Sequence, residues 1–245
     1  MARIYDLRDD TSSGKVYHRH ICRHMLDWLP RGKLLLDLGC GTGLFMRRYG
    51  ELGGTAIGLD ISRGMVEAAR EQGRWFEYLL GTAEVLPFRD GTFDAVSCVL
   101  AFSYLGNPGW MLGEAFRVLK PGWALAVSTL SRSVITSLVP AIYRLGEKME
   151  IGRIGVGNFG ERYNTEEEMV RIFSDAGYVD VKAKRCSFAH HSLKEPIFDI
   201  ARKVEPFIEK RVPGLAYNLV VCGRVPGVRT GISPPASRGP SSSSQ

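Results

Sequence analysis

A short apolar run that leads into a glycine-rich turn constrains this 245-residue chain more than any other feature. Residues 34–38 are too few for a buried helix, and glycines follow at positions 39, 41 and 43. This pattern predicts a buried parallel strand that turns sharply into a helix from Leu44. Glycine has no Cβ, so a ligand can approach the main chain of such a turn at contact distance. The turn therefore predicts a ligand site at the end of the strand.

A second strand end supports the same site. Residues 55–59 form another apolar run, which ends on Asp60. A carboxylate at the tip of a neighbouring strand can accept hydrogen bonds from both hydroxyls of a ribose. The two strand ends together predict one crevice for a nucleoside-like ligand.

Strand-like and helix-like segments alternate from residue 33 to residue 130, which is typical of an α/β protein with a parallel sheet covered on both faces. We predict strands near 33–38, 55–60, 75–80, 94–100, 123–129, 178–188 and 216–225. We predict helices near 15–29, 43–52, 63–72, 108–119 and 165–176. Expected helix starts are Asn107-Pro108 and Thr165, and expected stops are Gly53-Gly54, Gly73, Pro121-Gly122 and Gly177.

Three later segments lie outside this alternation. Residues 131–164 contain several glycines and are too long for a simple connection, so we predict a lid over the crevice, with a surface loop as the alternative. The end of the chain, 226–245, is rich in Pro, Gly and Ser and predicts a disordered tail. Between them lies an apolar stripe at helical spacing that predicts core packing: Ile197, Ile200, Ala201, Val204, Phe207 and Ile208.

Composition excludes several classes of protein. The chain is 44% hydrophobic and 24% charged, enough for one domain, and it has no apolar stretch of about 20 residues that could span a membrane. The N-terminus lacks the apolar segment of a signal peptide, so we expect a cytoplasmic protein. Five cysteines without a C-x-x-C pair argue against a zinc site or a disulfide framework and predict buried thiols. The net charge of +6 is dispersed, which favours a solvated surface over the alternative of a nucleic-acid partner.

The residues around the turn discriminate between ligands. A dinucleotide pyrophosphate favours G-x-G-x-x-G without a carboxylate nearby, whereas this chain has G-x-G-x-G with Asp37 two residues before the first glycine. That carboxylate would repel a pyrophosphate and attract an ammonium or sulfonium group. S-adenosylmethionine combines a nucleoside, an amino acid and a sulfonium, and it is the cofactor we predict.

Five motifs in order resemble the class I S-adenosylmethionine-dependent methyltransferases, in the branch of the ubiquinone and menaquinone C-methyltransferases (methyltransferase type 11). The motifs lie at 35–43, 58–62 with Met65, 81–88, 91–96 and 116–122. The resemblance implies a Rossmann-like, doubly wound sheet of seven strands, mostly parallel, with an antiparallel last strand at 216–225. We accordingly divide the chain into a cap helix (1–32), a cofactor core (33–130), a substrate lid (131–164), the rest of the same sheet (165–225) and a tail (226–245).

The resemblance also implies which residues bind the cofactor. Glycines 39, 41 and 43 would line its methionine part, Asp60 would bind the ribose, and Asp37 would act electrostatically. Around the adenine and the sulfonium it implies Ile61, Met65, Thr82, Ala83, Glu84, Leu100 and Ala101. Three positions depart from the family pattern: Thr82 replaces a frequent aspartate, residues 102–104 replace a histidine-bearing segment, and Trp123 replaces a glycine.

Other side chains are candidates for chemistry. For a base or an orienting group we consider Tyr104, Tyr163, His190 and His191. Tyr5 or Tyr17 could close the sulfonium side by cation–π contact, with packing against the sheet as the alternative. His20 and His24 have the spacing of metal ligands on a helix, but no third ligand motif accompanies them. For these two histidines we therefore predict a solvated helical face and no metal.

Three functions remain open. The first is a methyltransferase for a small, partly apolar acceptor held under the lid, whose apolar residues are Leu138, Val139, Ile142 and Tyr143. The second is a tRNA or protein methyltransferase that uses the dispersed basic residues. The third is a non-catalytic protein that binds S-adenosylmethionine, suggested by Thr82 and the missing histidine segment. The sequence leaves the oligomeric state open.

Overall fold

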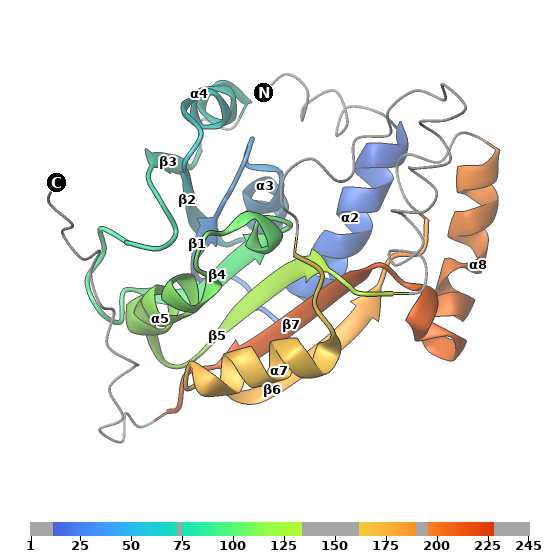
Figure 1. The fold of residues 1–245 in the computed structure, drawn as a ribbon. Coiled ribbons are helices and arrows are strands. Elements are labelled where there is room, and N and C mark those ends of the chain that lie inside the picture. Colours follow the sequence, from blue (N-terminus) through green and yellow to red (C-terminus); the bar gives the residue numbers. More distant parts are fainter. Residues whose placement is uncertain (1–11, 73–74, 134–161, 190–195, 228–245) are drawn as a thin grey trace, which may run out of the picture.

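A computed structural model describes residues 12–72, 75–133, 162–189 and 196–227. A seven-stranded sheet has helices on both faces (Figure 1). Its strands are β1 (Leu34–Leu38), β2 (Thr55–Asp60), β3 (Glu77–Leu80), β4 (Phe93–Val99), β5 (Leu119–Leu130), β6 (Val179–Cys186) and β7 (Asn218–Arg224). The helices are α2 (Ser12–Leu26), α3 (Leu44–Glu51), α4 (Arg63–Gln72), α5 (Pro108–Val118), α7 (Glu166–Asp175) and α8 (Ile197–Arg211), with short turns η1 (Phe102–Tyr104) and η2 (Pro213–Leu215).

The strand order β3-β2-β1-β4-β5-β7-β6 is that of a doubly wound sheet. Strands β1 to β5 are parallel, and β7 runs antiparallel to both β5 and β6, which confirms the predicted antiparallel last strand. The chain leaves β1 toward β2 on one side and leaves β4 toward β5 on the other. Ligands of such sheets bind where the winding direction reverses, at the carboxyl ends of the strands. The fold therefore places the crevice at the ends of β1 and β4.

Alternate residues of the strands serve the two faces of the sheet. Leu35 packs with α2, α3 and α4, whereas Leu36 and Leu38 pack with α5 and α7. This alternation follows from the two-residue repeat of a strand. All five cysteines are buried and free, as predicted.

Two helix starts form as their sequences predict. The Thr165 hydroxyl accepts a hydrogen bond from the Glu168 N–H at 3.2 Å, and the Glu168 carboxylate accepts one from the Thr165 N–H at 2.8 Å. This reciprocal pair is a capping box. At α5, the Asn107 side chain accepts from the Trp110 N–H at 3.4 Å, and Pro108 occupies the first turn.

The predicted helix stop at Pro121-Gly122 is wrong. Helix α5 already ends at Val118, and both residues lie in β5, where the register with β4 shifts after the Phe93–Leu119 pair. Gly122 has φ +85°, and its N–H donates to the Val225 carbonyl at 2.9 Å. Proline and glycine are tolerated in a strand at such an irregularity. They mark a bulge here and not a helix end.

The predicted core stripe of α8 is also wrong in part. Its period is helical, but the apolar residues that are exposed are Ile197, Ile200, Val204 and Phe207. Within the predicted stripe, Ala201 is buried and Ile208 is half-buried, and the other buried side chains of α8 are Phe198 and Glu205. Periodicity identifies a helix but does not decide which face is buried when a carboxylate on the other face has polar partners.

The prediction that His20 and His24 form a solvated face is contradicted. Their side chains are only 25% and 14% exposed, because α8 covers this side of α2 and brings Glu209 against both rings. Figure 1 shows α2 (blue) and α8 (orange) at the same end of the molecule. Because Glu209 lies so far away in the sequence, no pattern near His20 or His24 predicts this contact.

Several predictions fall outside the described residues: most of the lid (134–161), the tail beyond 227, Tyr5, Gly73, His190 and His191. The two ends of the lid segment meet, since Ser131 and Asn164 form a bridge and the Arg132 N–H donates to the Asn164 carbonyl at 2.9 Å. Among the described residues, no helix has the length and apolar character needed to cross a membrane.

Candidate functional site

The glycine turn after β1 is held against the end of β2. The N–H groups of Gly39 and Cys40 both donate to the Leu59 carbonyl, at 2.7 and 3.1 Å. Gly39, Gly41 and Gly43 all have positive φ, at +67°, +53° and +80°. A side chain strains such a backbone, so all three positions favour glycine.

The three glycines differ in what surrounds them. A Cβ on Gly39 would lie 2.4 Å from the Ala101 Cβ, and one on Gly43 would lie 2.6 Å from the Tyr78 hydroxyl oxygen. At Gly41 a Cβ would meet nothing within 4 Å. Gly39 and Gly43 therefore allow close packing, while Gly41 borders open space. It is the point of the turn where a ligand can reach the main chain.

Asp60 ties this turn to the one that follows β2. One carboxylate oxygen accepts from the Gly41 N–H and the other from the Ser62 N–H, both at 2.8 Å. Each carboxylate oxygen has two lone pairs, so both retain capacity for further donors such as ribose hydroxyls. The sequence predicted the ribose contact but not this second role in shaping the turn.

Asp37 is buried and does not border the crevice. It is 1% exposed, and its carboxylate accepts from the Ser97 hydroxyl of β4 at 2.7 Å. Burial raises the pKa of the Asp37 carboxyl to about 7; the bond from Ser97 opposes this shift and the charge of Asp60 adds to it. Asp37 can therefore act on a ligand only through the field of its charge. Sequence reasoning missed Ser97, whose signal is a hydroxyl between the apolar pairs Ala95-Val96 and Cys98-Val99 of β4.

Apolar side chains border Asp60. Ile61 is 77% exposed, Met65 on α4 is half-buried, and Leu80, which pairs with Asp60 across β2 and β3, is exposed. Exposed apolar groups beside a carboxylate suit a ligand with a flat apolar ring and a polar sugar. The predicted adenine residues Ile61 and Met65 thus lie close to Asp60 in the chain and at the same strand end.

Residues 82–84 form a turn that is fixed from within. The Thr82 hydroxyl accepts from the Glu84 N–H at 3.3 Å, so part of its acceptor capacity is used locally. The Glu84 carboxylate accepts from the Asn107 N–H at 2.6 Å, which fastens the turn to the start of α5. Ala83, between them, is buried. Glu84 thus orients this loop through a contact that the sequence did not predict.

The end of β4 is strained. Leu100 has φ +56°, although its N–H still bonds to the Ser128 carbonyl at 3.0 Å. A non-glycine residue in this conformation costs about 1–3 kcal/mol and is frequent at functional sites. The next residue, Ala101, packs against Gly39. Strain and close packing therefore meet at the reversal between β1 and β4.

The remaining candidates lie farther from the turn in the chain. Tyr104 is exposed, and the Arg162 N–H donates to the Ser103 carbonyl at 3.3 Å, so the segments that carry Tyr104 and Tyr163 adjoin. Tyr17 is buried; its ring stacks on Tyr217 and its hydroxyl accepts from the Asn218 amide at 2.7 Å. These contacts favour the packing alternative for Tyr17.

Comparison with known proteins agrees with this geometry. Residues 36–127 match the family called methyltransferase domain. Over 211 residues the chain is 30% identical to the ubiquinone/menaquinone biosynthesis C-methyltransferase of Roseobacter denitrificans, covering 76% of this chain and 83% of that protein. The chain belongs to the class I S-adenosylmethionine-dependent methyltransferases, in the ubiquinone and menaquinone C-methyltransferase branch. The cofactor of this methyltransferase is S-adenosylmethionine.

Two further relatives show how much of the chain the similarity covers. The malonyl-[acyl-carrier protein] O-methyltransferase of Yersinia pestis is 37% identical over 107 residues, which are 44% of this chain and only 40% of that protein. The methyltransferase therefore spans less than half the length of that relative. A crystal structure from Thermotoga maritima, described as a possible histamine N-methyltransferase, has a TM-score of 0.59 and 26% identity, covering 85% of this chain and 91% of that one.

The residues at the carboxyl edge fit this cofactor. Gly41 leaves its main chain open, Asp60 retains acceptor capacity for ribose hydroxyls, and exposed Ile61 offers an apolar surface. The two carboxylates, Asp37 and Asp60, favour a ligand that carries a positive charge. Nothing in this set favours a pyrophosphate.

Proposed function

We propose that this methyltransferase moves a methyl group from S-adenosylmethionine to a small, partly apolar acceptor. The observation that carries the proposal is the hydrogen bond between Asp60 and the Gly41 N–H. It brings an open stretch of main chain and a carboxylate with free acceptor capacity together where the winding of the sheet reverses. A cationic nucleoside needs both groups at one place.

The proposal assigns a role to each element of the edge. Glycines 39, 41 and 43 form the turn that lines the methionine part, with Gly41 open to it. Asp60 accepts from the ribose hydroxyls, and Asp37, when ionised, supplies negative charge from its buried position. The residues assigned to the adenine and the sulfonium are Ile61, Met65, Thr82, Ala83, Glu84 and Leu100. Tyr17 keeps a packing role in this assignment.

When bound, the cofactor supplies an electrophilic methyl group on a sulfonium. The chain contributes mainly by holding the acceptor in line with that methyl, because positive charge disappears from the cofactor side as transfer proceeds. Tyr104 and Tyr163 come from adjoining segments and are our candidates for orienting the acceptor or taking its proton. His190 and His191 remain candidates from the sequence alone.

Relatives of this chain support a small or carrier-linked acceptor. The Roseobacter protein is named for ubiquinone and menaquinone biosynthesis, and the Yersinia protein for malonyl-[acyl-carrier protein]. The apolar residues between 138 and 143 would contact such an acceptor. A cytoplasmic location stays a prediction, and a nucleic-acid partner stays the less favoured alternative.

Calorimetry with S-adenosylmethionine, S-adenosylhomocysteine and NAD tests the cofactor assignment, and binding of NAD alone would contradict it. The acceptor is sought by supplying labelled cofactor to a cell extract and searching for products heavier by one methyl group. Formation of S-adenosylhomocysteine with any acceptor excludes the non-catalytic alternative. Methylation of tRNA or protein, with no labelled small molecule, would favour the macromolecular alternative instead.

A further inference from the structure

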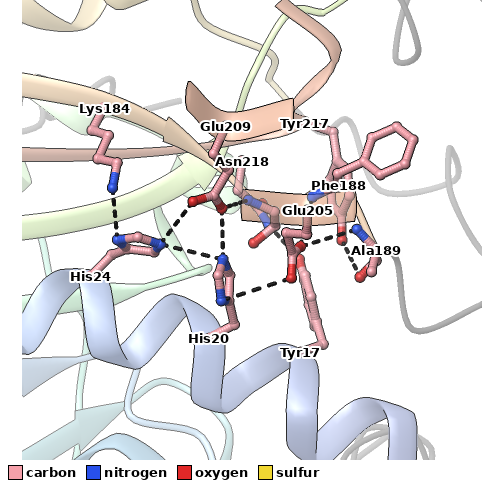
Figure 2. A network of polar contacts seen from close by, with 11 residues as sticks. Tyr17, His20, His24, Lys184, Phe188, Ala189, Glu205, Glu209, Tyr217 and Asn218 are labelled. Atoms are coloured by element: carbon pink, nitrogen blue, oxygen red, sulfur yellow. Dashed lines mark hydrogen bonds and ion pairs between the residues drawn. The ribbon is translucent and has the colours of Figure 1, made fainter. Parts of the chain in front are cut away.

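Two histidines of α2 and one glutamate of α8 converge on one point (Figure 2). The Nε2 atoms of His20 and His24 are 3.3 Å apart. The Glu209 carboxylate lies 2.6 Å from His20 Nε2 through one oxygen and 3.4 Å from His24 Nε2 through the other. Among the His, Cys, Asp and Glu side chains of the described residues, these three form the group whose possible ligand atoms all lie within 4.8 Å of one another.

The spacing of these atoms is close to that of a metal site. A tetrahedral zinc ion bound at about 2.0–2.1 Å holds its ligand atoms about 3.3 Å from one another. The distance between the two histidine nitrogens, 3.3 Å, has this value, and one Glu209 oxygen lies at a similar 3.4 Å from His24 Nε2. The third, 2.6 Å, is a hydrogen bond between His20 and Glu209, and it needs to open by about 0.7 Å to admit an ion.

Surrounding groups orient the ligands. A carboxylate oxygen of Glu205 lies 3.8 Å from His20 Nδ1, on the side of the ring away from Glu209. Metal-binding histidines usually direct their second nitrogen toward such a carboxylate. Glu209 itself is anchored, since it accepts from the Ser187 N–H at 2.8 Å. Two of the three ligands, His20 and Glu209, are therefore held by contacts outside the site.

We propose that His20, His24 and Glu209 form a binding site for a divalent transition-metal ion of the zinc type, which joins α2 to α8. Imidazole nitrogens and a carboxylate oxygen are ligands that zinc accepts, and three protein ligands leave a fourth position for water. The ion replaces the hydrogen shared by His20 and Glu209. It links two helices whose ligands are 189 residues apart in the chain.

Lys184 provides a second way to test the site. Its ammonium lies 3.3 Å from His24 Nδ1 and can only donate, so Nδ1 is the acceptor of this contact. A neutral histidine that binds a metal through Nε2 carries its hydrogen on Nδ1, so the exposed Lys184 side chain must then turn into solvent. Removing this positive charge should therefore favour the metal, whereas removing a ligand should oppose it.

Calorimetry of the full chain with Zn²⁺ alone tests the proposal. We expect one ion per chain at about micromolar affinity or tighter, and a higher melting temperature when the ion is present. His24→Gln should weaken binding by about tenfold or more, and Lys184→Met should strengthen it. Glu209→Gln should weaken binding like His24→Gln, while Glu167→Gln, an exposed glutamate of α7, serves as the matched control.

The choice of His24 keeps the test decisive, because its removal leaves the His20–Glu209 bond intact and the fold in place. Co²⁺ bound to the unmodified chain should show the intense visible absorption of tetrahedral coordination, and His24→Gln should lose it. The proposal is overturned if the unmodified chain fails to bind Zn²⁺, or if His24→Gln binds Zn²⁺ as tightly as the unmodified chain does.

Discussion

The cofactor edge and the junction between α2 and α8 use the same chemistry over very different distances in sequence. At the edge, Asp60 accepts from the Gly41 N–H 19 positions away. At the junction, Glu209 meets His20 across 189 positions. The first contact lies between two neighbouring strand ends, and the second depends on the whole sheet being assembled. A site built from main chain therefore has a local signature, whereas a cluster of side chains from distant helices has none.

The two regions also differ in what their carboxylates leave free. Asp60 holds two N–H groups and borders the open space at Gly41. Glu205 of α8 holds two N–H groups as well, those of Phe188 and Ala189 at 2.8 and 3.1 Å, and it is 5% exposed against 9% for Asp60, but it lies beside no open glycine turn. Loss of Asp60 should thus affect binding, and loss of Glu205 should affect stability.

Asp60→Ala should have the largest effect. It removes the proposed ribose contacts and also the bond that shapes the turn at Gly41, and charge-assisted hydrogen bonds contribute about 1.5–3 kcal/mol each. We expect the affinity for S-adenosylmethionine, measured by calorimetry, to fall by about 100-fold or more. Asp175→Ala, at an exposed aspartate of α7, is the control. An Asp60→Ala variant that binds the cofactor normally would show that the edge is not the site.

Glu205→Ala should act at the junction between α2 and α8 and not at the cofactor edge. It leaves the buried N–H groups of Phe188 and Ala189 without an acceptor, at a cost of about 3 kcal/mol in the free energy of unfolding. Denaturant titration measures this loss, while the affinity for S-adenosylmethionine should stay within about twofold. Glu205→Gln keeps an acceptor oxygen and should recover part of the stability. A large loss of cofactor affinity would mean that the two regions are coupled.

Gly39→Ala and Gly41→Ala separate packing from access within the edge itself. At Gly39 an added Cβ meets the Ala101 Cβ at 2.4 Å on a backbone with positive φ, so we expect a loss of about 2–3 kcal/mol in stability. At Gly41 the φ is also positive but the space is open, so the loss should be about 1 kcal/mol. Thermal unfolding compares the two variants. Equal losses would remove the distinction between a packed and an open glycine.

The same division between local patterns and distant contacts separates what the sequence could predict from what it could not. The strand ends at Asp60 and the glycine turn, the capping box at Thr165 and the antiparallel last strand all rest on local patterns or on the family resemblance. The bulge at Pro121-Gly122 was misjudged because the same residues also end helices. Apolar spacing alone gave no means to choose the buried face of α8.

The site shows the same limit. Ser97 could have been found, because strand register places it opposite Asp37 once β1 and β4 are taken as neighbours. Glu209 could not, since nothing near His20 or His24 in the sequence indicates a partner on the last helix. Contacts that form only after the sheet is complete are visible in the three-dimensional arrangement and not in the order of residues.

Asp37→Asn should raise the free energy of unfolding, so its effect on stability has the opposite sign to the effects predicted above. With a pKa of about 7 in the folded chain against an ordinary value of 3.8, the Asp37 carboxyl is protonated in the folded state and ionised in the unfolded state between those two values. The folded state then binds more protons, so this group's contribution to stability is complete below pH 3.8 and falls until about pH 7.

An asparagine side chain at this position cannot ionise, yet its carbonyl can still accept from Ser97. The stability advantage of Asp37→Asn over the unmodified chain should therefore grow by about 3 kcal/mol in unfolding free energy from pH 5 to pH 8, measured by denaturant titration at both values. Its affinity for the cationic cofactor should fall at pH 8, where the unmodified carboxyl is ionised and attracts a sulfonium, and should change little at pH 5, where that carboxyl is protonated. A variant that loses both stability and affinity would mean that Asp37 is needed for folding and not for charge. Opposite changes would identify it as a group that costs stability in order to bind the cofactor.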